Sequence, residues 1–288
     1  METIIKLKNV NKKFKDFSLE NLSLDINKGY ITGLIGSNGS GKSSTIRIMM
    51  DLMRPDSGDL EIFGLNYEEH EKEIKGRIGF VYDSNIYYEG LNLSDIQRIV
   101  GPAYRNWNKG TYFNYLKKFN LPKNKPIKTF SKGMQMKASL AIALSHDAEL
   151  LIMDEPTAGL DPVFRRELLN ILQDILIEEN RTIFFSTHIT SDLEKIADYV
   201  AFIKDGRVIF NHSINDLQEK FSLVKGELEL LDRDTSKAFV HINQSSDTFE
   251  AMTDDVEKIR RIFGDTVIID KISLEEIMYF FNGDDNDD

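Results

Sequence analysis

Apolar residues along the first 220 positions follow two alternating patterns. Short apolar runs, of the kind that form buried parallel strands, alternate with longer stretches in which apolar residues recur at helical spacing. Because strand and helix alternate, the sequence predicts an α/β fold with a parallel sheet and helices on both faces. The predicted buried strands span residues 30–36, 77–82, 149–154, 182–187 and 200–204, and the predicted helices span residues 42–53, 135–146, 162–179 and 191–199.

Three regions depart from this alternation. Residues 4–10 and 18–26 alternate apolar and polar positions, which predicts two half-buried strands near the N-terminus. Residues 91–128 mix Tyr and Trp with Lys and Asn and interrupt the rhythm, so we expect an inserted helical subdomain at about residues 84–148. Beyond residue 220, shorter apolar segments predict a small α/β unit of two or three strands and two helices.

The formal charge of −11 is unevenly distributed along the chain. Residues 221–288 hold 17 acidic and 7 basic side chains, whereas residues 1–220 hold 30 and 29. This shift predicts a domain boundary near residue 220, and it argues against nucleic acid as a partner of the C-terminal part. The final "GDDNDD" is expected to be a solvated, frayed end, because carboxylates this close together repel one another.

The composition excludes several kinds of site. The chain contains no Cys, so it has neither disulfides nor a thiolate metal site, which suits a reducing compartment. The first residues alternate as a strand does and lack the apolar core of a secretion signal. No apolar run approaches the roughly 18 residues that a membrane span needs, so we expect a chain that does not itself cross a membrane.

The stretch "GSNGSGKSS" carries Gly36, Gly41, Lys42 and Ser43 in the GxxxxGK[ST] pattern, directly after a predicted buried strand and directly before a predicted helix. Glycines let successive backbone N–H groups turn toward phosphate oxygens, and the helix adds its positive end. Lys42 would neutralise the β- and γ-phosphates, and the Ser43 hydroxyl would bind Mg²⁺. The alternative is a Gly-rich turn without a ligand, which this strand and helix context disfavours. Further contacts along the loop are expected from Ser37, Asn38, Gly39, Ser40 and Ser44.

A pair of carboxylates follows another predicted buried strand. A magnesium nucleotide needs a carboxylate across the site, at the end of a neighbouring apolar strand, and "LLIMDEP" supplies Asp154 and Glu155. Asp154 would hold Mg²⁺ through water, and Glu155 would act as the general base on the attacking water. The chain's four Asn-Lys dipeptides lack the Asp of the guanine-specific Asn-Lys-x-Asp stretch, so we expect ATP.

Five segments in this order and spacing resemble the ATP-binding subunit of an ABC transporter over residues 3–220. They are the phosphate loop, "FSKGMQ" (130–135), "LLIMDEP", "AGLD" (158–161) and "STH" (186–188). The resemblance implies a P-loop ATPase domain in residues 1–220, with a mixed, mostly parallel sheet, antiparallel N-terminal strands and the inserted helices. The acidic residues 221–288 resemble the C-terminal extension of small-exporter ATPases, which implies dimer contacts or regulation.

The resemblance also implies roles for individual residues, with ATP and Mg²⁺ as the ligands. Lys42, Glu155 and His188 would be catalytic, with His188 touching the γ-phosphate, and Ser43 and Asp154 would be at the metal. Asp161 would lie in the loop that couples two sites across a dimer. Phe14 stands where an aromatic ring stacks on adenine, although Phe17 is a rival for that position.

In this family the signature segment, here Ser131 to Gln135, binds the γ-phosphate of ATP held by the other subunit. The resemblance therefore implies that Ser131, Gly133 and Gln135 contact nucleotide across a dimer. We expect the helix start to be left unfilled by its own chain, with a hydroxyl, free N–H groups and a positive dipole end facing an anion. The alternative is an ordinary cap, in which Ser131 accepts from the N–H groups of the first turn.

Two segments depart from the family pattern. The common signature is LSGGQ, whereas this chain reads FSKGMQ and departs from it at Lys132 and Met134, a variation seen in exporter subunits of the ABC-2 kind. Asp83 stands where the family normally has Gln, and Asp is shorter and accepts hydrogen bonds only. We expect Asp83 to contact Mg²⁺ in the closed dimer, while its coupling role stays open.

Within the family, the chain resembles ATPases of bacitracin-type drug exporters and phenol-soluble-modulin peptide exporters of Gram-positive bacteria. That implies a subunit at the cytoplasmic face of the cell membrane, which powers export of peptides or drugs by ATP-driven dimer closure and hydrolysis-driven opening. Its implied partners are a transmembrane permease and a second ATPase subunit. A homodimer is the simpler expectation, and a heterodimer stays open. The alternatives are a non-transport ABC ATPase acting on ribosomes or DNA, and a purely regulatory nucleotide-binding module.

Overall fold

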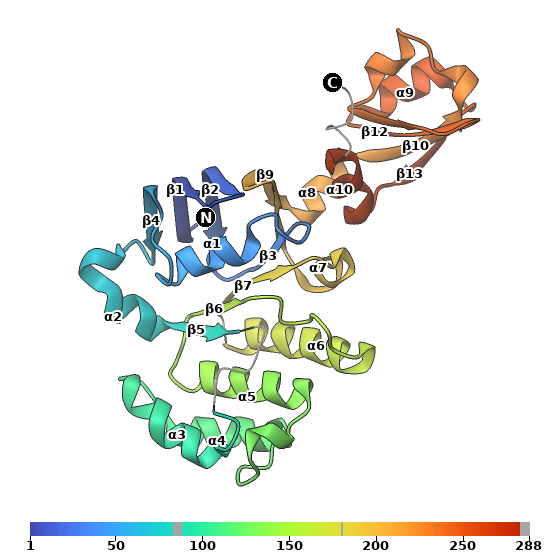
Figure 1. The fold of residues 1–288 in the computed structure, drawn as a ribbon. Helices are drawn as coiled ribbons and strands as arrows, with labels where there is room; N and C mark the ends of the chain where they lie inside the picture. The colour runs from blue at the N-terminus through green and yellow to red at the C-terminus, as the bar shows by residue number, and fades with distance from the viewer. Residues whose placement is uncertain (83–87, 180, 283–288) are drawn as a thin grey trace. The chain divides into compact units, whose positions relative to one another are not determined.

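A computed structural model describes residues 1–82, 88–179 and 181–282 (Figure 1). The chain divides into two compact units, Met1–Asn211 and His212–Asp288. The division lies a few residues before the boundary near residue 220 that the charge distribution predicts. Residue 220 is the last residue of helix α8 (Ile214–Lys220), inside the second unit. No helix in the described ranges is both long enough and apolar enough to cross a membrane.

The centre of the first unit is a six-stranded sheet with the strand order β5-β6-β7-β3-β8-β9. The first five strands in that order pair in parallel, which confirms the predicted α/β class. Every residue of β3, β6 and β7 is buried, as expected for parallel strands that are covered on both faces. The strands are β3 (Ile31–Ile35), β5 (Ile78–Val81), β6 (Leu150–Met153), β7 (Thr182–Thr187), β8 (Tyr199–Lys204) and β9 (Arg207–Ser213).

A three-stranded antiparallel sheet, ordered β2-β1-β4, forms the N-terminal part of the unit. Apolar residues from one face of β1 and β2 join helix α1 and central strand β6 in one core, including Leu7, Leu24, Ile46 and Ile152. The elements are β1 (Thr3–Lys13), β2 (Ser18–Asn27), α1 (Lys42–Met49) and β4 (Ser57–Ile62).

Two elements of this region have too weak a pattern to be predicted from sequence. Strand β4 buries only Ile62, and helix α2 (Tyr67–Arg77) buries only Ile74. Both are mostly charged or polar, so neither shows the apolar periodicity on which the sequence prediction depends.

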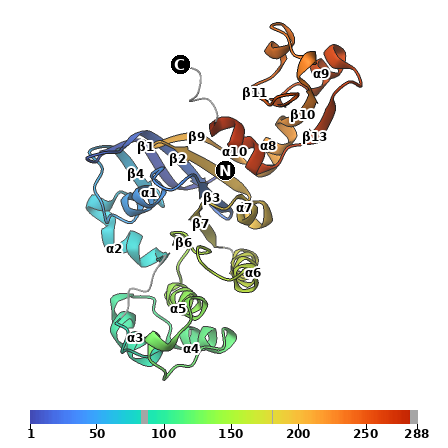
Figure 2. The same cartoon turned by 45° about the vertical axis from the view of Figure 1, so that its right-hand side comes forward.

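The inserted segment is helical, and both views place α3 and α4 beside α5 (Figure 2). Each of these helices has a side-chain cap at its first turn, in which Asn92, Asn108 or Ser131 accepts from the backbone N–H three residues on. The buried Tyr112 hydroxyl donates to Leu93 O at 2.9 Å and joins α4 to α3. The helices are α3 (Leu93–Val100), α4 (Lys109–Lys118), α5 (Lys132–Leu144), and, beyond the insertion, α6 (Pro162–Glu179) and α7 (Thr190–Ile196).

The second unit has a four-stranded antiparallel sheet, ordered β11-β12-β10-β13. Ile259 and Phe263 of α9 pack on Val224, Phe249 and Ala251 of the sheet. Beyond residue 220 the two predicted helices match α9 and α10, whereas the prediction of two or three strands was too low, since β12 was missed among the described residues. The elements, besides α8, are β10 (Ser222–Glu227), β11 (His241–Gln244), β12 (Thr248–Thr253), α9 (Val256–Phe263), β13 (Ile268–Lys271) and α10 (Leu274–Asn282).

A buried histidine joins the end of α5 to the central sheet. His146 is 1% exposed, with Nε2 at 2.9 Å from Ile78 O and Nδ1 at 3.3 Å from Ile142 O. The Tyr104 ring stacks on its imidazole at 3.9 Å between ring centroids. Burial lowers the pKa of His146 below its ordinary value. The imidazole therefore takes up a proton less readily in the folded chain than in the unfolded chain.

We predict that His146→Gln weakens the acid sensitivity of the first unit. Unfolded His takes up a proton near pH 6.5 and buried His146 resists it, so this contribution to stability is present above about pH 6.5 and is lost as pH falls below it. Neutral Gln has no proton to gain. The urea midpoint, followed by fluorescence of the single Trp, Trp107, should drop less between about pH 7 and about pH 5 in His146→Gln than in the wild type.

His70 is the matched control, because its side chain is 39% exposed on α2. In His70→Gln the urea midpoint should drop between the two pH values as much as it does in the wild type. Equal drops in His146→Gln and the wild type would contradict the assignment of this pH dependence to His146.

Candidate functional site

The phosphate loop lies between the end of β3 and the start of α1, as predicted. Gly41 is the N-cap of α1, with a left-handed φ of 111° and no side-chain hydrogen bond to the first turn. A Cβ at Gly41 would lie 2.6 Å from Leu19 Cδ2, so both backbone and space require glycine. The N–H groups of this first turn are therefore uncapped by any side chain, which suits an anion.

Lys42 is 5% exposed and holds the loop together. Its ammonium donates to Gly36 O at 2.9 Å and to Ser37 O at 3.1 Å. It also lies 3.3 Å from Glu155 Oε1. A buried ammonium that bonds to carbonyl oxygens and one carboxylate can turn its three donors to phosphate oxygens without a new desolvation cost.

The carboxylate of Asp154 faces the hydroxyl predicted to share a metal with it. Ser43 Oγ donates to Asp154 Oδ1 at 3.1 Å. A residue that the sequence analysis did not single out, Ser186, donates to the same oxygen at 2.7 Å and accepts from Glu155 N at 2.9 Å. Ser186 thus fixes both acids, and its one sequence signal is a hydroxyl at the end of an apolar strand.

Glu155 and His188 form a direct pair. His188 Nδ1 lies 2.8 Å from Glu155 Oε2. Glu155 adopts a left-handed φ of 48°, a conformation that costs energy for a non-glycine residue and is frequent at functional sites. The structure therefore brings together Lys42, Ser43, Asp154, Glu155 and His188, which come from three separate segments of the chain.

Lys42, Ser43, Glu155 and His188 line a cleft of about 660 Å³, which we call the nucleotide cleft, and Asp154 lies behind Ser43, to which it is hydrogen-bonded. Two residues that the sequence analysis did not place there, Arg47 and Lys132, add positive charge to it. Among the loop serines, Ser40 does not line the cleft, and its buried hydroxyl has no hydrogen-bond partner among the described residues. The cleft is lined by Phe14, Phe17, Asn38, Gly39, Gly41, Lys42, Ser43, Ser44, Arg47, Lys132, Glu155, Ala158 and His188.

Both candidate aromatic residues lie at this cleft. The Phe14 and Phe17 rings are 5.8 Å apart between centroids, and both side chains are half-buried. Phe17 also covers Gly41, because a Cβ there would lie 3.0 Å from Phe17 Cζ. Phe17 is thus occupied by packing on the phosphate loop, which leaves Phe14 as the better platform for a base.

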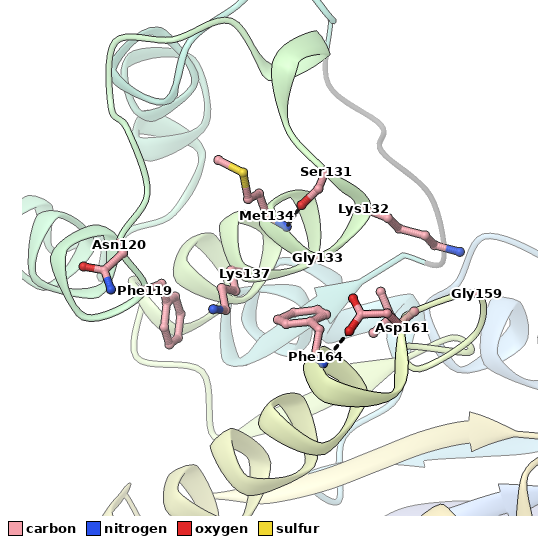
Figure 3. Close-up of a pocket in the computed structure, with 11 residues that line it drawn as sticks. Phe119, Asn120, Ser131, Lys132, Gly133, Met134, Lys137, Gly159, Asp161 and Phe164 are labelled. Atoms are coloured by element: carbon pink, nitrogen blue, oxygen red, sulfur yellow. Dashed lines mark hydrogen bonds between the residues drawn. The ribbon is translucent and has the colours of Figure 1, made fainter.

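A second cleft of about 380 Å³, which we call the signature cleft, opens at the start of α5 (Figure 3). Ser131 and Gly133 line it, together with Asp161 from the loop before α6. Ser131 Oγ accepts from Met134 N at 3.2 Å. The expectation that the chain leaves this helix end unfilled is therefore wrong for one N–H group, since Ser131 is an N-cap. A capping hydroxyl keeps its own proton, so it can still donate to an anion.

Other predicted residues have structural partners at the signature cleft. A Cβ at Gly133 would lie 2.8 Å from the Phe164 ring, so glycine allows α5 to pack on α6. Asp161 Oδ1 accepts from Val163 N and Phe164 N at 3.1 and 3.0 Å, and thereby caps α6. Gln135 donates from Nε2 to Phe130 O at 3.3 Å and does not line the cleft. Asp83 lies outside the described residues, and its contact with Mg²⁺ stays a prediction.

Comparisons with known proteins agree with this geometry. A family model described as ABC transporter matches residues 19–158. The bacitracin transport ATP-binding protein of Bacillus licheniformis is 32% identical over 96% of this chain and 90% of its own length. The lantibiotic transport ATP-binding protein of Streptococcus pyogenes is 32% identical over 76% of this chain and 96% of its own length.

Solved structures of similar fold include proteins that are described as ATP-binding. An ATP-binding subunit of an ABC transporter superposes with a TM-score of 0.67 and 27% identity, over 75% of this chain and 92% of its own. A dimeric ATP-binding cassette in a post-hydrolysis state, bound to ADP and phosphate, superposes with a TM-score of 0.64 and 26% identity, over 73% of this chain and 98% of its own.

We predict that Phe14→Ala weakens ATP binding while leaving the binding of inorganic tripolyphosphate unchanged. Stacking of a base on an aromatic ring contributes about 1–3 kcal/mol, so the dissociation constant for ATP should rise at least about fivefold, as measured by calorimetry. Phe17→Ala is the comparison, because it disturbs packing on Gly41 and should weaken both ligands alike. If Phe17→Ala weakens ATP binding more than tripolyphosphate binding and Phe14→Ala does not, the adenine stacks on Phe17 and the assignment to Phe14 is wrong.

Proposed function

The chain belongs to the family of ABC transporter ATP-binding proteins, and from that premise we propose how its own residues do the work. It is an ATP-binding and ATP-hydrolysing subunit that powers an ABC exporter. One observation carries the assignment of residues: Lys42, Ser43, Glu155 and His188, from three segments, line one nucleotide cleft, and the second acid, Asp154, accepts from Ser43 at its edge.

Lys42 and the free N–H groups at the start of α1 bind the β- and γ-phosphates of ATP. Ser43 and Asp154 offer hard oxygen ligands 3.1 Å apart, which fits Mg²⁺. No group of three or more His, Cys, Asp or Glu side chains in the described ranges could hold a metal, so phosphate and water would complete its ligands. When bound, Mg²⁺ supplies charge that stabilises the developing charge on phosphate oxygens.

Glu155 accepts the proton of the attacking water, and His188 orients that carboxylate. His188 Nδ1 fixes one oxygen of Glu155 at 2.8 Å, and the Lys42 ammonium lies 3.3 Å from the other. Once Lys42 turns to phosphate, the second oxygen is free to accept from water. Ser186 holds Glu155 N at 2.9 Å, which keeps the strained turn at Glu155 in place.

We propose that the working unit is a pair of chains, each completing the other's site. The γ-phosphate of ATP in one nucleotide cleft would meet the signature cleft of the second chain, where Ser131 and the first turn of α5 offer donors. The simplest second chain is another copy, since this chain carries every catalytic group. ATP then joins the pair, and hydrolysis opens it.

The partner that the pair drives is proposed to be a transmembrane permease, with the chain at the cytoplasmic face of the membrane. The bacitracin and lantibiotic relatives support peptides or drugs as cargo. Their names are those of transport proteins, which disfavours an ATPase acting on ribosomes or DNA. We propose that the acidic residues 221–288 form a separate domain for dimer contacts or regulation.

We predict that Glu155→Gln abolishes ATP hydrolysis, by a factor of about 10² or more, and traps an ATP-bound dimer. Gln keeps the shape of Glu155 and removes its basicity, so nucleotide still binds and the pair does not reopen. Phosphate release measures hydrolysis, and light scattering with and without ATP measures the dimer.

Glu149→Gln is the matched control, because Glu149 lies just before β6 whereas Glu155 lies just after it. Among the described residues, the hydrogen bonds of the Glu149 side chain go to Arg77, outside the nucleotide cleft. It should hydrolyse ATP as the wild type does. The proposal would be contradicted if Glu155→Gln hydrolysed ATP at the wild-type rate, or if its molar mass in light scattering did not increase when ATP is added.

A further inference from the structure

Lys132, which replaces a glycine of the common signature, makes a specific contact with a distant part of its own chain. Its Nζ donates to Ala158 O at 2.6 Å. The ammonium also lies close over the next residue, since a Cβ on Gly159 would be 3.0 Å from Nζ. Figure 3 shows the Lys132 side chain leaving the start of α5 toward Gly159. A glycine at position 132 could not make this contact.

The position of Lys132 is unusual in a second respect. Among the described residues, Lys132 alone lines both the nucleotide cleft and the signature cleft. It therefore lies where the site that holds this chain's own ATP borders the surface that would meet the ATP of a partner.

The loop that Lys132 contacts leads directly from the catalytic acid. Ala158 N donates to Glu155 O at 3.1 Å, and the chain then turns at Gly159, with a φ of 67°. Asp161 ends this loop and caps α6. The contact thus joins the first residues of α5 to a loop that begins at Glu155 and ends at Asp161.

The other links between α5 and α6 join side chains of the two helices and do not contact the loop backbone. Phe164 packs on Gly133, and Lys137 pairs with Glu167 at 2.8 Å. These contacts hold helix α5 against helix α6. Within the loop, Leu160 N donates to Thr157 O at 3.3 Å, and Lys132 adds a side-chain hydrogen bond from α5 to the loop backbone at Ala158 O.

We propose that Lys132 is a positioning residue that ties the signature segment to the Ala158–Asp161 loop of the same chain. The two surfaces that face the partner's nucleotide are then presented as one preformed unit, and that unit is linked to Glu155 of the chain's own site. This inference rests on the proposed pairing of chains and names a device that regulates it. Preformed surfaces lose less conformational freedom on pairing, which strengthens association.

Lys132→Met tests the role of the ammonium, because Met keeps an unbranched chain of similar length and removes the donor. The ATP concentration for half-maximal dimer formation, measured by light scattering in the Glu155→Gln background, should rise about five- to tenfold. In the otherwise wild-type chain the KM for ATP should rise similarly, and kcat should change much less. Binding of ATP to the single chain, measured by calorimetry at a concentration below dimer formation, should weaken less than dimer formation does, since Lys132 supplies one positive charge at the edge of the nucleotide cleft.

Two further variants make the result specific. Lys132→Arg keeps a cationic donor and should restore most of the dimer affinity that Met loses. Lys128→Met removes the same charge from an exposed side chain four positions earlier and should behave as the parent does. A merely structural role would lower the melting temperature in Lys132→Met, and the KM-against-kcat split would not appear.

The outcomes separate this inference from the proposed function. If the Glu155→Gln parent forms no ATP-dependent dimer, the proposed function itself fails. If the parent forms the dimer and Lys132→Met forms it at the same ATP concentration, only the role of Lys132 is overturned. It is also overturned if Lys132→Arg is as defective as Lys132→Met, or if the loss lies in kcat with KM unchanged.

Discussion

Strands β6, β7 and β3 lie side by side in parallel in the central sheet, and the site depends on that pairing. Parallel strands end at the same edge of a sheet, so the residues that follow them meet there. β3 leads into the phosphate loop, β6 into Asp154 and Glu155, and β7 into His188. The all-buried apolar runs of these strands fix their places, and the polar side chains beyond them are brought within hydrogen-bond distance as a result.

The second cleft is built by the inserted helices and the loop after Glu155. Ser131 caps α5 and still has a hydroxyl proton to donate, so capping and anion binding are compatible at that residue. A single chain therefore presents two incomplete halves, a nucleotide cleft with catalytic groups and a signature cleft with donors. Lys132 lies between the two halves, and a Met or Gly there would remove the ammonium that links them.

Sequence predicts the fold and the first cleft well because their signals are local. Both the mostly apolar strands and the spacing around Gly41 and Lys42 are visible in short stretches of sequence. β4 and α2 escape prediction because each buries a single side chain. Ser186 escapes because a hydroxyl at a strand end has no distinctive pattern, and the role of Lys132 escapes because its partner, Ala158 O, lies 26 positions away.

The central claim is that each ATP site is shared by two chains, and mixing two defective chains tests it most directly. Lys42→Ala removes the phosphate ligand, whereas Ser131→Asp keeps a good N-cap and places a negative charge against the γ-phosphate. Neither chain should hydrolyse ATP alone. In a mixed pair, the phosphate loop of the Ser131→Asp chain faces the intact Ser131 of the Lys42→Ala chain. We expect the mixture to regain up to about a quarter of wild-type hydrolysis, since about half the pairs are mixed and each has one intact site of two. A mixture no more active than its components measured separately would contradict the account.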